Sequence, residues 1–386
     1  MKKFTQSVFK TLLPSAAIVS SVLMVITPSG CHSVTEGLTF LEGDFSTPQI
    51  SSFTLTGTES AEIAFSKEIS QINADIFRKH NPEEKISASE FTKAEGNCIR
   101  IRFSEKTKTG CAYVMEGSAA DDSGNSVTFS IPFTGWNENP AVLVLNEVRN
   151  SYGTVKENGS SVHKTEFAEV FVLKGGNLSG LEICSLCDGE EKKYVFPPVE
   201  VSQGEYITVH MRTPENTASC PDDGKGTVSE TGTDLSLSTH IDSCDSARDF
   251  WAENTKTVFA DTDIIMIRDG SKIYDCLYYA KSSFEGWKEK QAPEAKKILN
   301  CRLWEGEPVC SDAITTAATG RSFSRQNLKE IKKAFSEEEN KSEFTVRNSR
   351  NSWLITADSG SGKNKVTGVT PGYENSSSEY RARAKK

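Results

Sequence analysis

The stretch from Val142 to Ile183 constrains the fold of this chain more than any other. It opens with the near-continuous apolar run VLVLNEV and continues, after a polar insert, with TEFAEVFVLKGGNLSGLEI. Apolar runs of this length, bounded by turn residues and rich in valine and leucine, are typical of buried β-strands. The stretch therefore predicts two or three central strands with a glycine turn, where a short front module meets a longer back module.

Alternation of apolar and polar residues marks the front module, residues 50–137. SSFTLTG, AEIAFSKEIS, CIRIRF, CAYVMEG and SVTFSIPF all follow this pattern. Such alternation, with β-branched and aromatic residues and a turn roughly every ten positions, predicts an antiparallel β-sandwich. The polar run Ala120 to Asn125 predicts a tight turn before the last strand.

The back module, residues 140–376, combines further strands with long polar inserts. TDIIMIRDGSKIYDCLYY predicts a hairpin that turns at Asp269-Gly270. Inserts run from Thr213 to Phe250, from Lys281 to Thr316 and from Leu328 to Asn348. The last of them contains LKEIKKAFSEEENK, which predicts a helical turn or two. Loops of this length in a compact domain are usually functional or disordered.

Both modules resemble known families. AEIAFSKEIS and YVMEGSAADDSGNSVTFSIPFTG are similar to strands of bacterial immunoglobulin-like domains, which serve as spacer or adhesive modules. The back module resembles a lamin-tail domain through an ordered series of short motifs. These are Leu145 to Val148, Glu166 to Val170, Asn177 to Leu181, Gly320 to Arg325, Ser352-Trp353 and Thr370 to Asn375.

The resemblance implies an immunoglobulin-like sandwich that binds or scaffolds and has no catalytic residues of its own. We therefore expect an all-β protein of two immunoglobulin-like antiparallel β-sandwiches in tandem, the second with long loop insertions.

The N-terminus predicts export. Residues 1–30 combine lysines, an apolar run from Leu12 to Ile26 and small residues before Cys31. This order is typical of a secretory signal peptide, and the apolar run is too short for a comfortable transmembrane helix. Pro28-Ser29-Gly30-Cys31 resembles the looser lipoprotein boxes of spirochaetes, which implies an acyl (palmitate) anchor on Cys31. Ordinary secretion without lipidation is the alternative. Residues 31–49 would form a polar linker.

The charge balance argues against nucleic acid as a partner. The net charge is -9 over 386 residues, whereas nucleic-acid binders present a basic face. Residues 377–386 form a short basic tail that we expect to be disordered. Arg321 and Arg325 could contact phosphate, although stacking on the sheet or pairing with acids is the expected role.

Export favours disulfides among the remaining nine cysteines. Cys220 and Cys244 bracket one polar stretch, Cys301 and Cys310 bracket another, and these are the preferred pairs. Cys184 and Cys187 have C-x-x-C spacing, but a zinc site would need a second such pair. Their expected role is structural.

No stretch carries a catalytic or metal-binding signature, and the sequence indicates no cofactor. Glu147, Glu166 and Glu169 are the densest carboxylates near predicted strands, and we expect them to be structural. His163, His210 and His240 lie outside any metalloprotease or hydrolase motif. The alternative is a secreted metal-dependent hydrolase or nuclease that uses aspartates around Asp242 and Asp245.

The leading interpretation is a lipid-anchored protein of the cell envelope, at the outer membrane or cell surface, that binds without catalysis. Large rigid aromatic side chains contribute most to binding hot spots. Trp251, Trp287 and Trp304 in the inserts are therefore candidate anchors, with core packing as the alternative. The ligand is not identified, and both a protein and a glycan remain open as partners.

Overall fold

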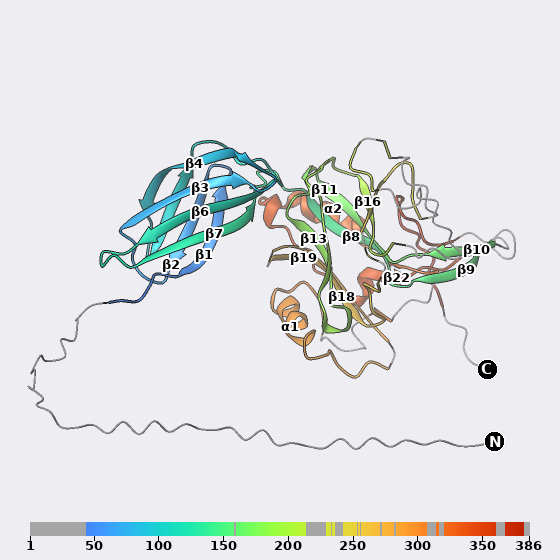
Figure 1. Cartoon of the computed structure of the whole chain (residues 1–386). Helices are drawn as coiled ribbons and strands as arrows, with labels where there is room; N and C mark the ends of the chain where they lie inside the picture. Colours follow the sequence, from blue (N-terminus) through green and yellow to red (C-terminus); the bar gives the residue numbers. More distant parts are fainter. Residues whose placement is uncertain are drawn as a thin grey trace, which may run out of the picture. The chain divides into compact units, whose positions relative to one another are not determined.

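The computed structural model describes residues 44–381 apart from 158–159, 214–228, 233, 236–241, 253, 255, 271, 282, 307–313, 316–319 and 360–366. The predicted signal peptide, Cys31 and most of the linker lie outside the described residues, as does the second half of the basic tail. Its first half is bonded to the second sandwich, where Tyr380 N–H donates to Ile355, so the expected disorder does not extend over residues 377–381. The described chain is built almost entirely of β-strands (Figure 1). Neither of its α-helices has the length and apolar character of a membrane-spanning segment.

Seven antiparallel strands form the first sandwich. They are β1 (Ile50–Gly57), β2 (Ser60–Phe65), β3 (Gln71–Arg78), β4 (Asn81–Lys93), β5 (Cys98–Phe103), β6 (Ala112–Ala120) and β7 (Ser126–Thr134), in the spatial order β1-β2-β5-β4-β3-β6-β7. The strand β4 is long enough to serve both layers, because its first half pairs with β3 and its second half with β5.

The core of this sandwich follows directly from the alternation in the sequence. Ile63, Ile76, Ile101 and Met115 alternate with more exposed residues and are fully buried in one cluster. The predicted turn before β7 is confirmed: the Asp121 carboxylate accepts the N–H groups of residues 123 and 125, and Gly124 has a φ of 83°.

Two larger sheets form the second sandwich. The six-stranded sheet has the order β17-β16-β11-β8-β21-β22, and the five-stranded sheet has the order β14-β13-β18-β19-β20. The first contains β8 (Val142–Arg149), β11 (Phe167–Lys174), β16 (Tyr206–His210), β17 (Arg248–Trp251), β21 (Phe323–Arg325) and β22 (Trp353–Ile355). The second contains β13 (Leu181–Ser185), β14 (Lys192–Val195), β18 (Asp263–Asp269), β19 (Lys272–Ala280) and β20 (Ile314–Thr315). Two short ribbons pair β9 (Gly153–Glu157) with β10 (Ser160–Lys164) and β12 (Gly176–Asn177) with β15 (Glu200–Val201).

One hydrophobic core lies between these two sheets. Leu145, Val170 and Ile207 from the first sheet share it with Ile183 and Leu277 from the second. The all-β prediction is therefore confirmed, and β8 and β11 are central strands as their apolar sequences predict. The sheets are antiparallel except for the pairs β16–β17 and β19–β20, which are parallel.

Short helices occupy the inserts. α2 (Leu328–Glu337) confirms the helix predicted there, and its Ile331 and Phe335 pack on Phe171 and Leu173 at the outer side of the six-stranded sheet. α1 (Ala292–Asn300) was not predicted. One-turn 3-10 helices cover Cys187–Gly189, Lys341–Glu343 and Arg350–Ser352. The predicted hairpin at Asp269-Gly270 joins β18 to β19, where Gly270 has a φ of 53°.

Candidate functional site

The six-stranded sheet carries ionisable side chains on its outer face. Val148, Val170 and Val209 point inward to the hydrophobic core, and the residues that alternate with them point to the opposite side. This polar face consists of Glu147 and Arg149 on β8, Glu169 on β11, Thr208 and His210 on β16, and Asp249 on β17, all of which are buried. Because buried ionisable groups are costly unless paired, their partners decide what this face can do.

Two glutamates form the centre of the polar face. Glu147 and Glu169 are direct cross-strand neighbours, next to a bulge at Asn146 that places one extra residue in β8. Thr370 N–H donates to both oxygens of Glu147, at 3.3 and 3.0 Å, and Gly372 N–H donates to Glu169. The sequence Thr370 to Asn375, here called the strap, is therefore fastened onto the sheet by these carboxylates.

Side chains complete the attachment of the strap. Asn375 donates to the backbone oxygen of Asn146 at 2.9 Å and to that of Arg325 at 2.9 Å. Asn146 in turn donates to Glu169 at 2.7 Å, and the hydroxyl of Ser322 donates to Glu147. Leu-Asn-Glu-Val, Glu166 to Val170, Gly-Arg-Ser-Phe-Ser-Arg and Thr-Pro-Gly-Tyr-x-Asn therefore meet at one place.

Burial shifts the titration of this glutamate pair. Removal from water raises the pKa of Glu147, and hydrogen bonds from Ser322 and Thr370 oppose that rise. Burial also raises the pKa of Glu169 well above its ordinary value, and the negative charge of Glu147 adds to the effect. Two adjacent buried carboxyls favour a state in which at least one is protonated. The expected structural role of these glutamates agrees with their contacts.

A buried ion cluster lies beside the glutamates. Asp242 accepts hydrogen bonds from both terminal nitrogens of Arg149 and lies 3.2 Å from Nζ of Lys164. All three side chains are at most 3% exposed. The Arg149 guanidinium also lies over the ring of Phe167, 4.9 Å from its centroid. Asp242 therefore balances two buried cations from inside the protein.

His210 belongs to a second polar group on the same face. Its Nε2 lies 2.6 Å from Oδ1 of Asp249, and its Nδ1 lies 3.2 Å from the hydroxyl of Thr165. Asp249 Oδ2 accepts hydrogen bonds from Trp251 Nε1 and the hydroxyl of Ser243, both at 2.8 Å. A hydroxyl, an imidazole and a carboxylate in a row resemble a hydrolytic triad in type. Thr165, His210 and Asp249 are at most 1% exposed, so a substrate cannot reach them in this structure.

The arginines of Gly-Arg-Ser-Phe-Ser-Arg have the expected structural roles. Arg325 is buried, donates to Asp275 at 2.6 Å and to Asn348 at 2.7 Å, and stacks on Trp353 with its guanidinium carbon 4.3 Å from the ring centroid. Arg321 stacks on Tyr380 at 3.6 Å. Asn348 also donates to Asp275 at 2.7 Å, which closes a buried triangle of side chains.

The predicted tryptophan anchors contribute mainly to packing. Trp251 is 6% exposed and stacks on His210 with a centroid distance of 3.9 Å. Trp304 is 3% exposed and stacks on Tyr278 at 4.7 Å, and Trp287 is partly buried against the same tyrosine. The core-packing alternative therefore holds for Trp251 and Trp304, because their apolar surface is already covered.

The aspartates of the alternative hydrolase are not arranged as a metal site. Asp242 is held by Arg149 and Lys164, whereas Asp245 is exposed. Within the described ranges, no cluster of three histidine, cysteine or acidic side chains has the arrangement of metal ligands. The side chains of His163 and His240 lie outside the described residues.

The predicted disulfides are not observed. Cys244 and Cys301 are free thiols, while their predicted partners Cys220 and Cys310 lie outside the described residues. Cys184 is fully buried in β13, and burial raises the pKa of its thiol to about 12. A thiol with such a pKa is a poor nucleophile, so the structural interpretation of the C-x-x-C sequence agrees with the environment of Cys184.

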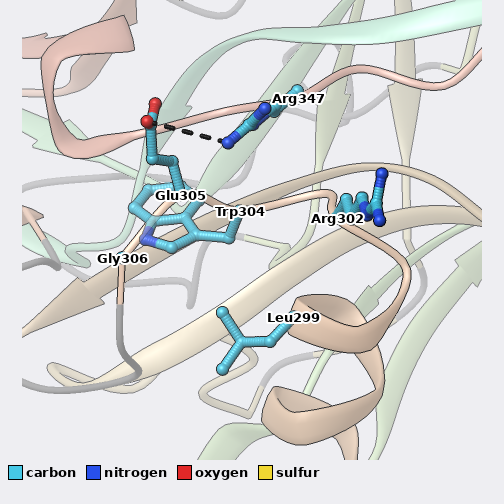
Figure 2. A pocket seen from close by; sticks show the side chains of 6 residues that line it. All are labelled: Leu299, Arg302, Trp304, Glu305, Gly306 and Arg347. Atoms are coloured by element: carbon cyan, nitrogen blue, oxygen red, sulfur yellow. Dashed lines mark ion pairs between the residues drawn. The ribbon is translucent and has the colours of Figure 1, made fainter.

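A pocket of about 360 Å³ opens next to α1 (Figure 2). It is lined by Leu299, Arg302, Trp304, Glu305, Gly306 and Arg347. Arg347 and Glu305 form an ion pair at 3.7 Å, and both are 65% exposed. Another pocket, of about 420 Å³, includes Lys281, whose amino group pairs with Asp261 at 2.6 Å.

The two walls of the first pocket are held together by the backbone. Asn348 N–H donates to Leu303 at 2.9 Å, and Glu305 N–H donates to Asn348 at 2.7 Å. Asn348 is itself fixed by Arg325 and Asp275. The two arginines of the pocket, Arg302 and Arg347, therefore extend from segments whose spacing the buried polar triangle stabilises.

Arg302 has an unusual backbone conformation. It is the single non-glycine residue with a positive φ, 58°, in the described part of the chain. The N–H of Arg302 donates to Leu299 at 2.9 Å and that of Leu303 to Ile298 at 3.1 Å, which forms a Schellman motif after α1. Glycine is preferred at this position because a side chain there costs roughly 1–2 kcal/mol.

Sequence reasoning did not identify Arg302 or Arg347. Both are exposed residues in charged inserts without a recognisable motif. An arginine directly after a short amphipathic helix, where glycine is usual, is the signal that could have indicated Arg302, but α1 itself was not predicted.

Comparisons with solved structures give only weak similarity. The N-terminal part of the bacterial S-layer protein SbsC shares 16% identity and a TM-score of 0.22, over 33% of this chain and 41% of that chain. A DUF4876 family protein from Bacteroides thetaiotaomicron shares 10% identity and a TM-score of 0.27, over 67% of this chain and 82% of that chain. These TM-scores are too low to support a conclusion about the protein.

Sequence comparisons are more informative. An "Uncharacterized protein" from Treponema pallidum (strain Nichols) is 31% identical over 182 residues. The match covers 46% of this chain and 42% of that protein, so it spans less than half of the relative's length. The family model described as "TP_1001_2nd: protein second domain" matches residues 141–355, which are more than half of the chain. The protein described here therefore belongs to that family and is related to a spirochaete protein.

Proposed function

We propose that this protein is an exported, lipid-anchored protein of the cell envelope whose second sandwich binds a partner without catalysis. The observation that carries the proposal is the sealed polar face. Asp242 and Asp249 are buried and engaged by side chains of the same sandwich, and Glu147 and Glu169 hold the strap. Groups fixed in this way stabilise an architecture, and they leave binding to the exposed surface.

The anchor is proposed from the N-terminal sequence. Small residues precede Cys31 after a charged start and an apolar run, as in spirochaete lipoproteins. The relationship to a Treponema protein supports a spirochaete-like origin, in which such loose boxes would be recognised. One acyl chain gives only marginal attachment to a membrane, so a stable anchor would require more than one chain.

The lamin-tail resemblance supports a binding or scaffolding role for the second sandwich. Four of its motifs meet at the attachment of the strap, through the bonds of Thr370 to Glu147, of Gly372 to Glu169 and of Asn375 to Asn146 and Arg325. The series Asn177 to Leu181 lies elsewhere, where Asn137 donates to the backbone oxygens of Asn177 and Ser179. Ordered motifs that meet in space are expected when one fold requires them all.

The anchor is tested by metabolic labelling with radioactive palmitate. The wild-type chain should incorporate label and partition into the detergent phase, whereas Cys31→Ser should do neither. Ser33→Ala, two residues further on, serves as the matched control and should keep the label. Equal labelling of wild type and Cys31→Ser would contradict the anchor.

Surface exposure is tested by protease treatment of intact cells. The second sandwich should be digested while a periplasmic marker protein survives. Survival of both until the outer membrane is opened would contradict exposure at the surface and would place the protein inside the envelope.

A further inference from the structure

We infer that the pocket beside α1 binds the carboxylate of a sugar acid, with Arg302 as its principal ligand. The inference deepens the proposed function, because it rests on that proposal for the statement that binding is the task of this sandwich. The inference adds the place of the binding site and the chemical class of its ligand. The site residues are Arg302, Arg347, Glu305, Trp304 and Leu299.

Arg302 occupies a position where the backbone favours glycine. Its left-handed conformation ends α1 in a Schellman motif, and the capping bonds come from main-chain N–H groups that glycine would supply equally well. The helix end therefore does not explain the side chain. Its guanidinium is exposed and borders the pocket (Figure 2). A side chain that adds strain at this position without serving the helix end points to a function of the residue.

The second arginine, Arg347, can leave its present ion pair and bind a ligand carboxylate. Arg347 meets Glu305 only at 3.7 Å, with both side chains 65% exposed. Exposed ion pairs of this kind contribute little, so a ligand carboxylate can compete for the guanidinium. Guanidinium groups match carboxylates because they donate two parallel hydrogen bonds. Two such groups at one pocket are notable on a chain with a net charge of -9.

The other lining residues favour a sugar acid over a simple anion. Glu305 would accept hydrogen bonds from hydroxyl groups, and its negative charge disfavours a dianion such as phosphate. Leu299, which is partly exposed at the pocket, offers apolar surface to the C–H groups of a sugar ring. The volume of about 360 Å³ lies at the small end of ligand sites, which suits one or two sugar units.

The test is a saturation-transfer NMR titration of the full chain with D-glucuronate. D-Glucose, which lacks the carboxylate, and inorganic phosphate are titrated in parallel. Saturable binding of glucuronate, with glucose and phosphate weaker by at least about tenfold, would support the inference. No saturable binding of glucuronate, or equal binding of glucose or phosphate, would overturn it.

Variants of Arg302 distinguish an effect of its guanidinium on binding from an effect on the stability of the fold. Arg302→Gly should keep or raise the melting temperature, because glycine is preferred at this position, yet weaken glucuronate binding by at least about tenfold. Arg302→Lys should weaken it to a smaller extent, because the charge remains without the paired donors. Arg381→Ala, 88% exposed in wild type and absent from the pocket lining, is the control and should bind normally.

Normal binding by Arg302→Gly would overturn the role of Arg302. These outcomes do not depend on the anchor, because palmitate labelling and protease exposure are measured on cells and do not involve the pocket. A protein that is lipidated and exposed but does not bind glucuronate would keep the proposed location and lose this ligand.

Discussion

Asp242 is the residue whose removal tests the buried polar face most directly. Substitution by alanine would remove the carboxylate that pairs with the buried Arg149 and contacts Lys164. Breaking a buried ion pair from one side costs about 3–5 kcal/mol, because the remaining charge stays desolvated. We therefore expect Asp242→Ala to lower the free energy of unfolding by this amount in urea denaturation.

Asp245 provides the matched control, three positions along the same insert. It is exposed, so Asp245→Ala should change stability by no more than about 0.5 kcal/mol. Equal losses from the two substitutions would show that Asp242 is not part of a sealed cluster. If Asp242 instead served a hydrolase, its removal would abolish activity and leave stability unchanged.

Single residues also show where sequence reasoning reached its limit. The glutamates of β8 and β11 were assigned structural roles, and their bonds to the strap agree with that expectation. The sequence allows Trp251 and Trp304 to be either binding anchors or core residues, and both are buried. A tryptophan in a polar insert can pack on the hydrophobic core or extend into solvent. Its neighbours in the folded structure determine which of these two positions it takes. For Trp251 the deciding neighbour is His210, 41 positions earlier in the sequence.

At the scale of elements, α2 is a short helix held by one apolar stripe. Phe335 is 6% exposed and packs in the cluster that also contains Phe171, Leu173 and Ile331. A helix of ten residues is not stable alone in water, so this packing must maintain it. We expect Phe335→Ala to cost about 3–5 kcal/mol, measured by chemical denaturation, and to increase amide exchange throughout α2.

A substitution at the neighbouring exposed residue Lys333 distinguishes the effect of packing from the effect of helix propensity. Lys333→Ala lies on the solvent side of α2 and should leave both stability and exchange unchanged within about 0.5 kcal/mol. If Phe335→Ala behaved in the same way, the helix would not depend on its contact with the sheet.

Elements with a strong local pattern could be predicted, and those defined by long-range pairing could not. Strands β8, β11, β18 and β19 follow from apolar runs and a turn signal. The parallel pairing of β16 with β17 joins segments separated by a long polar insert, for which no local rule gives the partner. α1 was missed because its nine residues contain only two buried side chains, Ala295 and Ile298, within a charged stretch.

At the scale of the whole molecule, carboxyl groups with opposite shifts determine how stability depends on pH. Burial raises the pKa of Glu166 to about 7 and that of Asp263 to about 7. Their carboxylates accept main-chain N–H groups, from Phe259 for Glu166 at 3.2 Å and from Leu186 for Asp263 at 3.0 Å, and the charge of Arg212 partly opposes the rise for Glu166. By contrast, the hydrogen bond from Lys67 lowers the pKa of Asp121 to about 2.

These shifts predict greatest stability in mildly acidic solution. Glu166 and Asp263 bind protons more tightly when folded, so their contribution is full below their unfolded pKa values near 4 and is lost as the pH rises towards 7. Asp121 acts in the opposite sense and loses its contribution below about pH 4. Each pKa unit corresponds to about 1.4 kcal/mol, so unfolding at pH 5 should require on the order of a few kcal/mol more than at pH 8.

Glu166→Gln and Asp263→Asn should each flatten this dependence of stability on pH in urea titrations at several pH values, whereas the exposed Glu337→Gln should not. A stability that is constant or rises between pH 5 and pH 8 would contradict the raised pKa values of Glu166 and Asp263.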